Sequence, residues 1–151
     1  MDDHNKLLKG LWACEEARVW AATQPDLQTA WSNCQRGDWM LWLVARTTVS
    51  TDDPRLRLMA CDFAEAVLHL IPEGEERPRK AIEVARRFAA GEATREELAA
   101  AEAAAWDAAW AAAEAAAEAA ARDAQAQIIR RYIPECPEIA AETIEKVEAY
   151  R

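Results

Sequence analysis

"AAAEAAAWDAAWAAAEAAAEAAARD", residues 99–123, decides the fold class of this chain. Alanine has the highest helix propensity of all residues, so a segment this rich in alanine forms a helix with little support from the rest of the fold. A capping box formed by Thr94 and Glu97 opens the segment, and no helix breaker follows before Pro134. The sequence therefore predicts one long alanine-rich helix over about 94–133.

Tryptophans and glutamates give this helix two kinds of surface. Trp106 and Trp110 lie one turn apart, and each ring can bury roughly 200 Å². We therefore expect the helix to be the spine of the fold, anchored by these rings, with Glu102, Glu114 and Glu118 facing water. The alternative is an exposed helix whose glutamates meet a basic partner.

The rest of the chain also favours helices. It has only 4 Gly and 6 Pro in 151 residues, fewer turn residues than a β-rich fold needs. Apolar residues recur at helical spacing, and the length suits one domain. We predict an all-α fold, a single-domain bundle over residues 1–151 with about seven helices. The expected helices outside the alanine-rich segment cover about 2–23, 25–35, 38–46, 51–71, 78–90 and 137–150.

Several helix ends carry local signals. Asp38 is expected to cap the short apolar helix that it opens, and Thr51 or Asp52 the next helix. Pro78 suits the first turn of a helix, where its missing N–H has no partner to lose. Gly91 is expected to end that helix in the position that glycine favours. The anchors expected on the last helix are Ile139, Ile144, Val147 and Tyr150.

The composition excludes several classes of protein. The net charge of −9 disfavours attraction to nucleic acid phosphates or to anionic lipids. The opening residues lack the basic-then-apolar pattern of a signal peptide, and the only long apolar run carries carboxylates. We therefore expect a cytoplasmic protein with no direct contact to nucleic acid or membrane.

The cysteines and histidines do not form a recognisable metal or catalytic motif. None of the 4 Cys lies within four residues of another, so zinc-ligand and redox spacings are absent. Reduced thiols are expected, with Cys14 and Cys61 buried on helices. His4 is expected in a frayed N-terminus and His69 near a helix end, where it would interact with the helix dipole. The prediction is no catalytic residue, no metal, no cofactor and no enzyme.

A charged turn precedes the helix expected over 78–90. One interpretation is an ion-pair network that joins two helices. The other is a partner-recognition patch, because planar guanidinium groups suit protein interfaces. Trp39 and Trp42 are open to the same alternatives, core or interface. The candidate partner-binding residues are Glu73, Glu75, Glu76, Arg77 and Arg79 of this turn, together with Glu102, Glu114 and Glu118 of the alanine-rich helix.

Two segments, "GDWMLWLVAR" from Gly37 and "HLIPEGEERPRKAIEVARRFAAGEAT" from His69, precede the alanine-rich helix. Together they resemble a family of immunity proteins of bacteria and phages, the immunity-protein-five-like group. The resemblance spans about Gly37–Ala124, and it implies an intracellular protein that binds and neutralises another protein, typically a toxin. The matching positions are Asp38, Trp39, Leu41, Trp42, Glu75, Arg77, Pro78, Arg79, Lys80, Ala81, Ile82 and Glu83.

Charge, motifs and resemblance together predict a protein that acts by stoichiometric contact with a protein partner, without turnover. Its acidity would complement a basic partner and speed association. One alternative is a phage-encoded inhibitor of a bacterial defence system, such as an anti-CRISPR protein whose acidic surface replaces DNA. A second alternative is a scaffold whose long helix mediates assembly into a homo-oligomer.

Overall fold

The computed structural model describes residues 3–71, 73–103 and 119–149, and this part of the chain is all-α, as predicted. It contains more helices than the seven expected, because the helices expected over 2–23 and 51–71 are each divided in two. A helical stretch at 95–103 adds to those named here. Their bounds are α1 Asp3–Gly10, α2 Glu15–Ala21, α3 Leu27–Asn33, α4 Gly37–Val44, α5 Pro54–Ala66, η1 (a 3-10 helix) Leu68–Leu70, α6 Arg77–Ala89, α8 Ala119–Tyr132 and α9 Ala141–Ala149.

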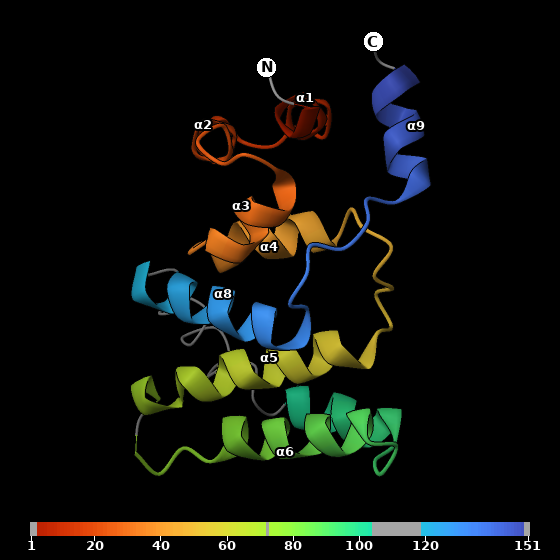
Figure 1. The fold of residues 1–151 in the computed structure, drawn as a ribbon. Coiled ribbons are helices and arrows are strands. Elements are labelled where there is room, and N and C mark those ends of the chain that lie inside the picture. Colours follow the sequence, from red (N-terminus) through yellow and green to blue (C-terminus); the bar gives the residue numbers. More distant parts are fainter. Residues whose placement is uncertain (1–2, 72, 104–118, 150–151) are drawn as a thin grey trace.

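The helices stack in layers (Figure 1). α6 packs on α5, α5 packs on α8, and α8 packs on α4 with its other side. α1, α2 and α3 lie beyond α4, and α9 contacts α1 at the same end. The first and last helices therefore share one end of the molecule, while α5 and α6 lie toward the other.

α8 lies at the centre of the core. Ala126 and Ile129 of this helix are 0% exposed, and Met59 of α5 is 1% exposed. A Cβ added to Gly37, at the start of α4, would overlap the Cβ of Gln125 and lie 3.0 Å from the backbone nitrogen of Ala126. The small residues on both helices thus allow a close approach, as alanine packing predicts.

Two parts of the alanine-rich segment are described, and both are helical: residues 95–103 and α8. The capping box is confirmed, since the Thr94 N–H donates to Glu97 Oε2 at 2.9 Å and the Glu97 N–H to Thr94 Oγ1 at 3.1 Å. In Figure 1 residues 95–103 (teal) lie at the level of α6, on the other side of α5 from α8, so the two parts do not share one axis. Outside the described residues lie Trp106, Trp110, Glu114, Glu118 and the junction between the two parts.

The single helix expected over about 2–23 is wrong, because α1 and α2 are separate helices. α1 ends in a Schellman motif, in which the Ala13 N–H donates to the Leu8 carbonyl at 3.0 Å and the Trp12 N–H to the Lys9 carbonyl at 3.1 Å. Trp12 adopts the left-handed conformation, with a φ of 64°. Both helices bury apolar residues in one core, so the apolar spacing runs through the turn and hides it.

The cap expected at Asp38 is also wrong. α4 begins one residue earlier, at Gly37, with Arg36 in the cap position. The Asp38 carboxylate instead accepts two hydrogen bonds from the Arg36 guanidinium, at 2.9 and 2.8 Å. An acidic residue in the first turn still suits the positive end of the helix, so the signal was real but shifted in register.

The next two helices follow their local signals more closely. α5 is capped by Asp53, one residue beyond the expected Thr51 or Asp52, and its carboxylate accepts from a backbone N–H at 2.9 Å. Pro78 lies in the first turn of α6, and Gly91 follows that helix with a φ of 77°. Both of these predictions are confirmed.

Residues 133–140 cross back over the N-terminal layer as an irregular strap. The Trp31 indole N–H donates to the Ile133 carbonyl at 3.0 Å. Further along, Thr47 and Ile139 form an isolated antiparallel bridge. The strap thereby ties the end of α8 to α3 and to the chain after α4.

This pairing shortens the last helix, which was expected over 137–150 and begins only at Ala141. Ile139 packs against the core from the strap, so it is an anchor, although not a helical one. Ile144 is 40% exposed and does not anchor the helix as expected. The described residues leave out Tyr150 and the side chain of Val147.

Candidate protein-binding site

The turn between α1 and α2 exposes a large aromatic side chain. Trp12 is 84% exposed, and Val19 on α2 is 65% exposed. Trp12 occupies the Schellman position that glycine fills most often, because the left-handed conformation crowds a Cβ. In this conformation, a residue with a Cβ lowers the stability of the fold by about 1 kcal/mol relative to glycine. Folding therefore gains neither burial nor good backbone geometry from this tryptophan.

The end of α6 shows what the same geometry normally holds. The Gly91 N–H donates to the Phe88 carbonyl at 3.0 Å and the Glu92 N–H to the Arg87 carbonyl at 2.7 Å, in the pattern that ends α1. At α6 the left-handed residue is glycine, whereas at α1 it is Trp12. A tryptophan that strains the backbone and stays in water is a candidate binding residue.

Helices α1–α4 and the turn between α1 and α2 line an open apolar pocket of about 60 Å³. Trp20 and Trp39 meet in its wall, with ring centroids 5.9 Å apart and planes at 49°. Cofactor sites are several times larger, whereas this volume suits an aliphatic side chain of a protein partner. The tryptophans that line the pocket are Trp20, Trp31, Trp39 and Trp42.

Two arginines cover the outer tryptophans of the pocket. The Arg36 guanidinium lies 4.3 Å from the Trp39 ring centroid, and the Arg46 guanidinium lies 3.8 Å from that of Trp42. The hydrogen bonds from Arg36 lower the pKa of Asp38, so this charged rim is held in place. Trp39 and Trp42 are half-buried against the core. Their packing against the core is therefore shown, and a role in an interface stays a prediction.

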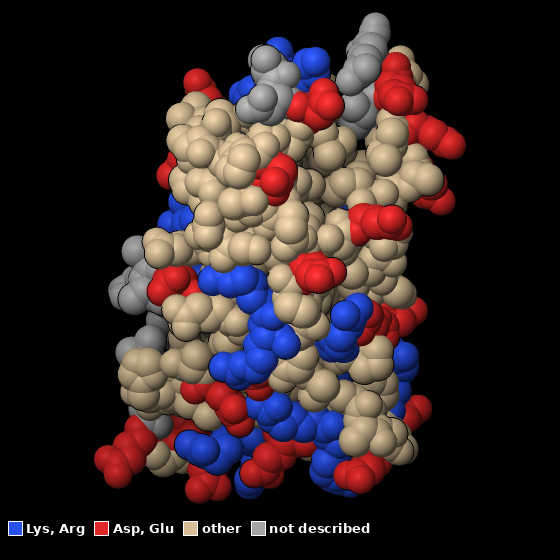
Figure 2. All heavy atoms as spheres, in the orientation of Figure 1, with Lys and Arg blue, Asp and Glu red and all other residues tan. Residues whose placement is uncertain are grey.

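Charged side chains gather at the other end of the molecule. Figure 2 shows a band of basic residues over α8 and α5, with acidic residues among and below them toward α6. The surface over α1–α4 has wide areas without charge in the same view. In this view, the face over α1–α4 thus offers more uncharged surface than the face over α5, α6 and α8.

His4 is buried, contrary to the expected frayed terminus, with 8% of its surface exposed. Its Nε2 lies 3.0 Å from the Ala21 carbonyl oxygen. The contact joins α1 to the end of α2 and so braces the turn that presents Trp12. The prediction failed because the partner of His4 lies 17 residues away, in another helix.

The charged turn before α6 brings two of its predicted residues together. The Glu75 carboxylate accepts from the Arg77 side chain at 2.7 Å and from its backbone N–H at 3.1 Å. These bonds lower the pKa of Glu75 to about 2. The pair lies within one turn of chain and orders the start of α6, while Glu73, Glu76 and Arg79 are exposed. A role of this turn in partner recognition stays a prediction.

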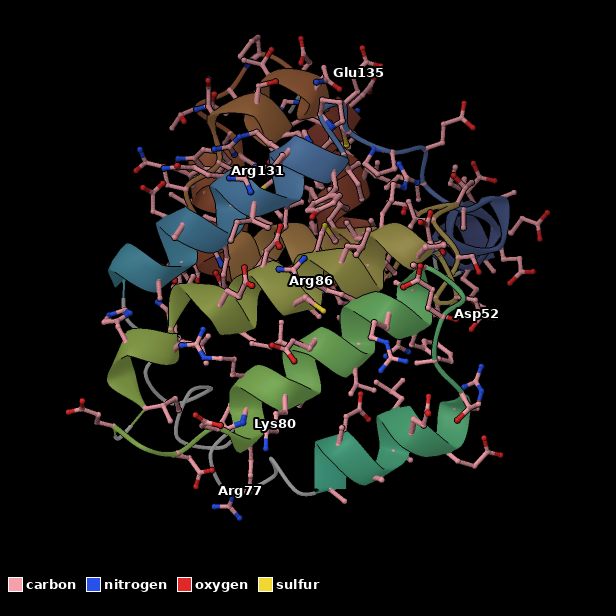
Figure 3. The ribbon with its side chains drawn as sticks, turned by 90° about the horizontal axis from the view of Figure 1, so that it is seen from below. Asp52, Arg77, Lys80, Arg86, Arg131 and Glu135 are labelled. Atoms are coloured by element: carbon pink, nitrogen blue, oxygen red, sulfur yellow. The ribbon has the colours of Figure 1, made fainter. Side chains whose placement is uncertain are left out.

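An ion-pair network that joins helices lies instead around Asp62 of α5, where no prediction placed it. Its carboxylate accepts from Arg86 of α6 at 2.8 Å and from the Tyr132 hydroxyl of α8 at 2.7 Å. Arg131 lies 3.6 Å away, and Figure 3 shows it beside Arg86. Burial raises the pKa of Asp62, but these bonds lower it by more, so it lies below its ordinary value. The local sequence does not indicate this network, because Arg86 and Tyr132 are 24 and 70 residues away from Asp62 along the chain.

Of the glutamates predicted on the alanine-rich helix, Glu102 lies in the described part of the chain. Its carboxylate is 3.7 Å from Arg57 Nη1 of α5, and its side chain is 60% exposed. Glu102 therefore pairs with a basic group of this chain. Glu114 and Glu118 lie outside the described residues.

The cysteines are free thiols. Cys34 and Cys61 are buried, and burial raises the pKa of both. Burial also raises the pKa of Cys136 to about 11. Cys14 is exposed just before α2, so the expectation that it is buried on a helix is wrong.

The described ranges contain no group of three or more His, Cys, Asp or Glu side chains that could hold a metal ion. No helix among the described residues has the length and apolar character needed to cross a membrane. No family model, curated protein or solved structure matches the chain. The resemblance to immunity proteins therefore stays a prediction based on the segments from Gly37 and His69.

Proposed function

We propose that this chain is a stoichiometric protein inhibitor of the immunity-protein type, which binds its partner through the end formed by α1–α4. The observation that carries the proposal is Trp12, 84% exposed in a left-handed turn position. The ring neither packs in the core nor suits its backbone, so its benefit comes from a partner. Tryptophan is also among the residues most enriched in binding hot spots.

The chemistry of this end defines the partner surface. Trp12 and Val19 adjoin Ala13 and Trp20, which line the apolar pocket. We infer a partner that offers an aliphatic side chain to the pocket and an apolar patch to the Trp12 ring. A hot-spot ring of this kind contributes on the order of 2–4 kcal/mol to binding. The net charge of −9 favours a basic partner and speeds the encounter.

Trp12→Gly tests the proposal, because glycine suits the backbone while the variant lacks the ring. The partner is isolated from source cells by affinity purification, identified by mass spectrometry and titrated by isothermal titration calorimetry. We expect an equimolar complex that inhibits the partner, and an affinity weaker by about 30-fold or more for Trp12→Gly, which corresponds to a loss of about 2 kcal/mol or more. The variant should also resist urea better by about 1 kcal/mol, so weaker binding would not reflect unfolding.

Ile144→Ala is the matched control, because it removes another exposed apolar side chain, from α9. It should leave the affinity unchanged. Equal binding by wild type and Trp12→Gly would contradict the proposed surface. A homo-oligomer without a partner would favour the scaffold alternative, and a partner from a bacterial defence system would favour the phage-inhibitor alternative.

A further inference from the structure

A cleft of about 540 Å³ lies between the start of α5 and the end of α6, toward the opposite end from Trp12. This volume is in the range of small-ligand and peptide sites. Figure 3 shows Asp52, one of its lining residues, beside the turn after α6 and away from Arg77 and Lys80. The lining residues that matter here are Asp52, Asp53, Leu56, Arg57, Phe88 and Arg95.

Two arginines of the cleft lie over one aromatic ring. The guanidinium carbons of Arg57 and Arg95 are 4.9 and 5.5 Å from the centroid of the Phe88 ring. Stacking of this kind leaves the N–H groups at the guanidinium edge free to donate. Two like charges beside one ring repel, and an anion between them relieves that repulsion. No carboxylate of the described residues lies within ion-pair distance of Arg95.

Arg57 already pairs with a carboxylate of this chain. The Glu102 carboxylate lies 3.7 Å from Arg57 Nη1. The Glu102 side chain is 60% exposed and that of Arg57 is 35% exposed. An exposed ion pair contributes about 1 kcal/mol or less, so another carboxylate can displace it. Glu102 therefore acts as an internal competitor for the cleft.

We propose that this cleft binds the carboxylate of an acidic peptide segment that has apolar neighbours. Arg57 and Arg95 hold the carboxylate, and Phe88 contacts the apolar side chain. The Asp53 carboxylate is bonded to Arg55. Arg57, Arg95 and Asp52 therefore leave one net positive charge in the cleft, which favours a single carboxylate over a phosphate dianion. The site does not depend on the proposed function, because Trp12 takes no part in it.

The test titrates acetyl-Leu-Glu-Leu-amide, its glutamine analogue and inorganic phosphate into the full chain. NMR shifts of the arginine side-chain N–H groups report binding. We expect saturable millimolar affinity for the glutamate peptide, about fivefold tighter than for the glutamine peptide and for phosphate. Free N-acetylglutamate should bind more weakly than the peptide, and equal affinity would overturn the assignment to a peptide.

Three variants sharpen this test. Arg95→Gln should weaken binding about fivefold, and Glu102→Ala should strengthen it severalfold by removing the internal competitor. Lys80→Gln, which changes an exposed lysine of α6 outside the cleft lining, should bind as wild type does. Equal affinity for the two peptides, or no saturation of Glu102→Ala by about 10 mM peptide, would overturn the proposal. Trp12→Gly should bind the peptide normally, which separates failure here from failure of the proposed function.

Discussion

Asp62 of α5 gathers partners from two other helices, α6 and α8, onto one carboxylate that is only 13% exposed. Its pKa is lower in the folded protein than its ordinary value. A carboxylate of this kind stabilises the fold above its unfolded pKa of about 4. That stabilisation disappears as the pH falls through the folded pKa, because the protonated group loses its attraction to Arg86 and Arg131.

Asp62→Asn should lower the free energy of unfolding by about 2 kcal/mol at neutral pH. The difference from wild type should narrow below pH about 4, where the wild-type carboxyl also becomes neutral. Urea denaturation between pH 7 and pH 3 measures both effects. Glu65 contacts the same Arg86, but its side chain is 52% exposed. Glu65→Gln should therefore lower the free energy of unfolding clearly less than Asp62→Asn does. If the difference in unfolding free energy between wild type and Asp62→Asn stays constant with pH, the proposed role of the Asp62 carboxylate is contradicted.

Among the elements, α8 organises the α-helical layers by close contact and by hydrogen bonding. The start of α4 presses against its backbone at Gly37. From the same helix, Arg130 donates to the Cys34 carbonyl at the end of α3, at 2.5 Å. A cation there also suits the negative end of the α3 dipole. α8 thus positions α3 and α4, which form part of the pocket beside Trp12.

Gly37→Ala tests the close approach of α4 and α8. In an exposed helix this substitution stabilises by roughly 1 kcal/mol, because alanine has the better propensity. Here the new methyl group would meet Gln125 and the backbone of Ala126, so we expect a loss of about 1–3 kcal/mol. Thermal and urea denaturation show whether Gly37→Ala raises or lowers the free energy of unfolding. A variant as stable as wild type would mean that the two helices lie farther apart.

Over the whole molecule, burial decreases from the centre of the stack outward. Ala126 and Ile129 of α8 are completely buried, whereas Ile144 of α9 is 40% exposed. Local opening needs the least free energy where few apolar contacts are lost. We therefore expect α8 to open last among the described helices, and α9 first.

Native-state hydrogen exchange should reproduce this order. Amides in the middle of α8 should exchange last, close to the rate set by global unfolding, and those of α9 first. Mass spectrometry of peptides from each helix measures the rates. Protection of α9 equal to that of α8 would show that the C-terminal helix is held more tightly than its exposure implies.

Local chemistry explains which predictions succeeded. The Thr94–Glu97 capping box, Pro78 in a first turn and Gly91 after α6 each depend on residues within one or two turns, so one short segment contains both partners. The Glu75–Arg77 pair is equally local, but it is not the expected network that joins two helices. The cap at Asp38 failed because Arg36 binds its carboxylate, a competition that cap preferences do not include.

The candidate site was barely predictable from the sequence. The spacing of apolar residues leaves Trp39 and Trp42 as either core or interface, and it predicts that Trp12 lies inside a continuous helix. Its exposure follows from a turn that apolar spacing does not reveal. The cleft at Phe88 joins two helices with the 95–103 segment, and no short stretch of sequence brings those residues together.

The sequence by itself determined the all-α class and several helix ends, because helix propensity and capping are local properties. Only the tertiary structure decided which side chains are buried, bonded or presented. His4 is buried by a contact 17 residues away, and Asp62 is bonded to Tyr132, 70 residues away. Trp12 remains outside the core because the helices around it close without it. Such outcomes depend on how whole helices pack, which no local pattern encodes.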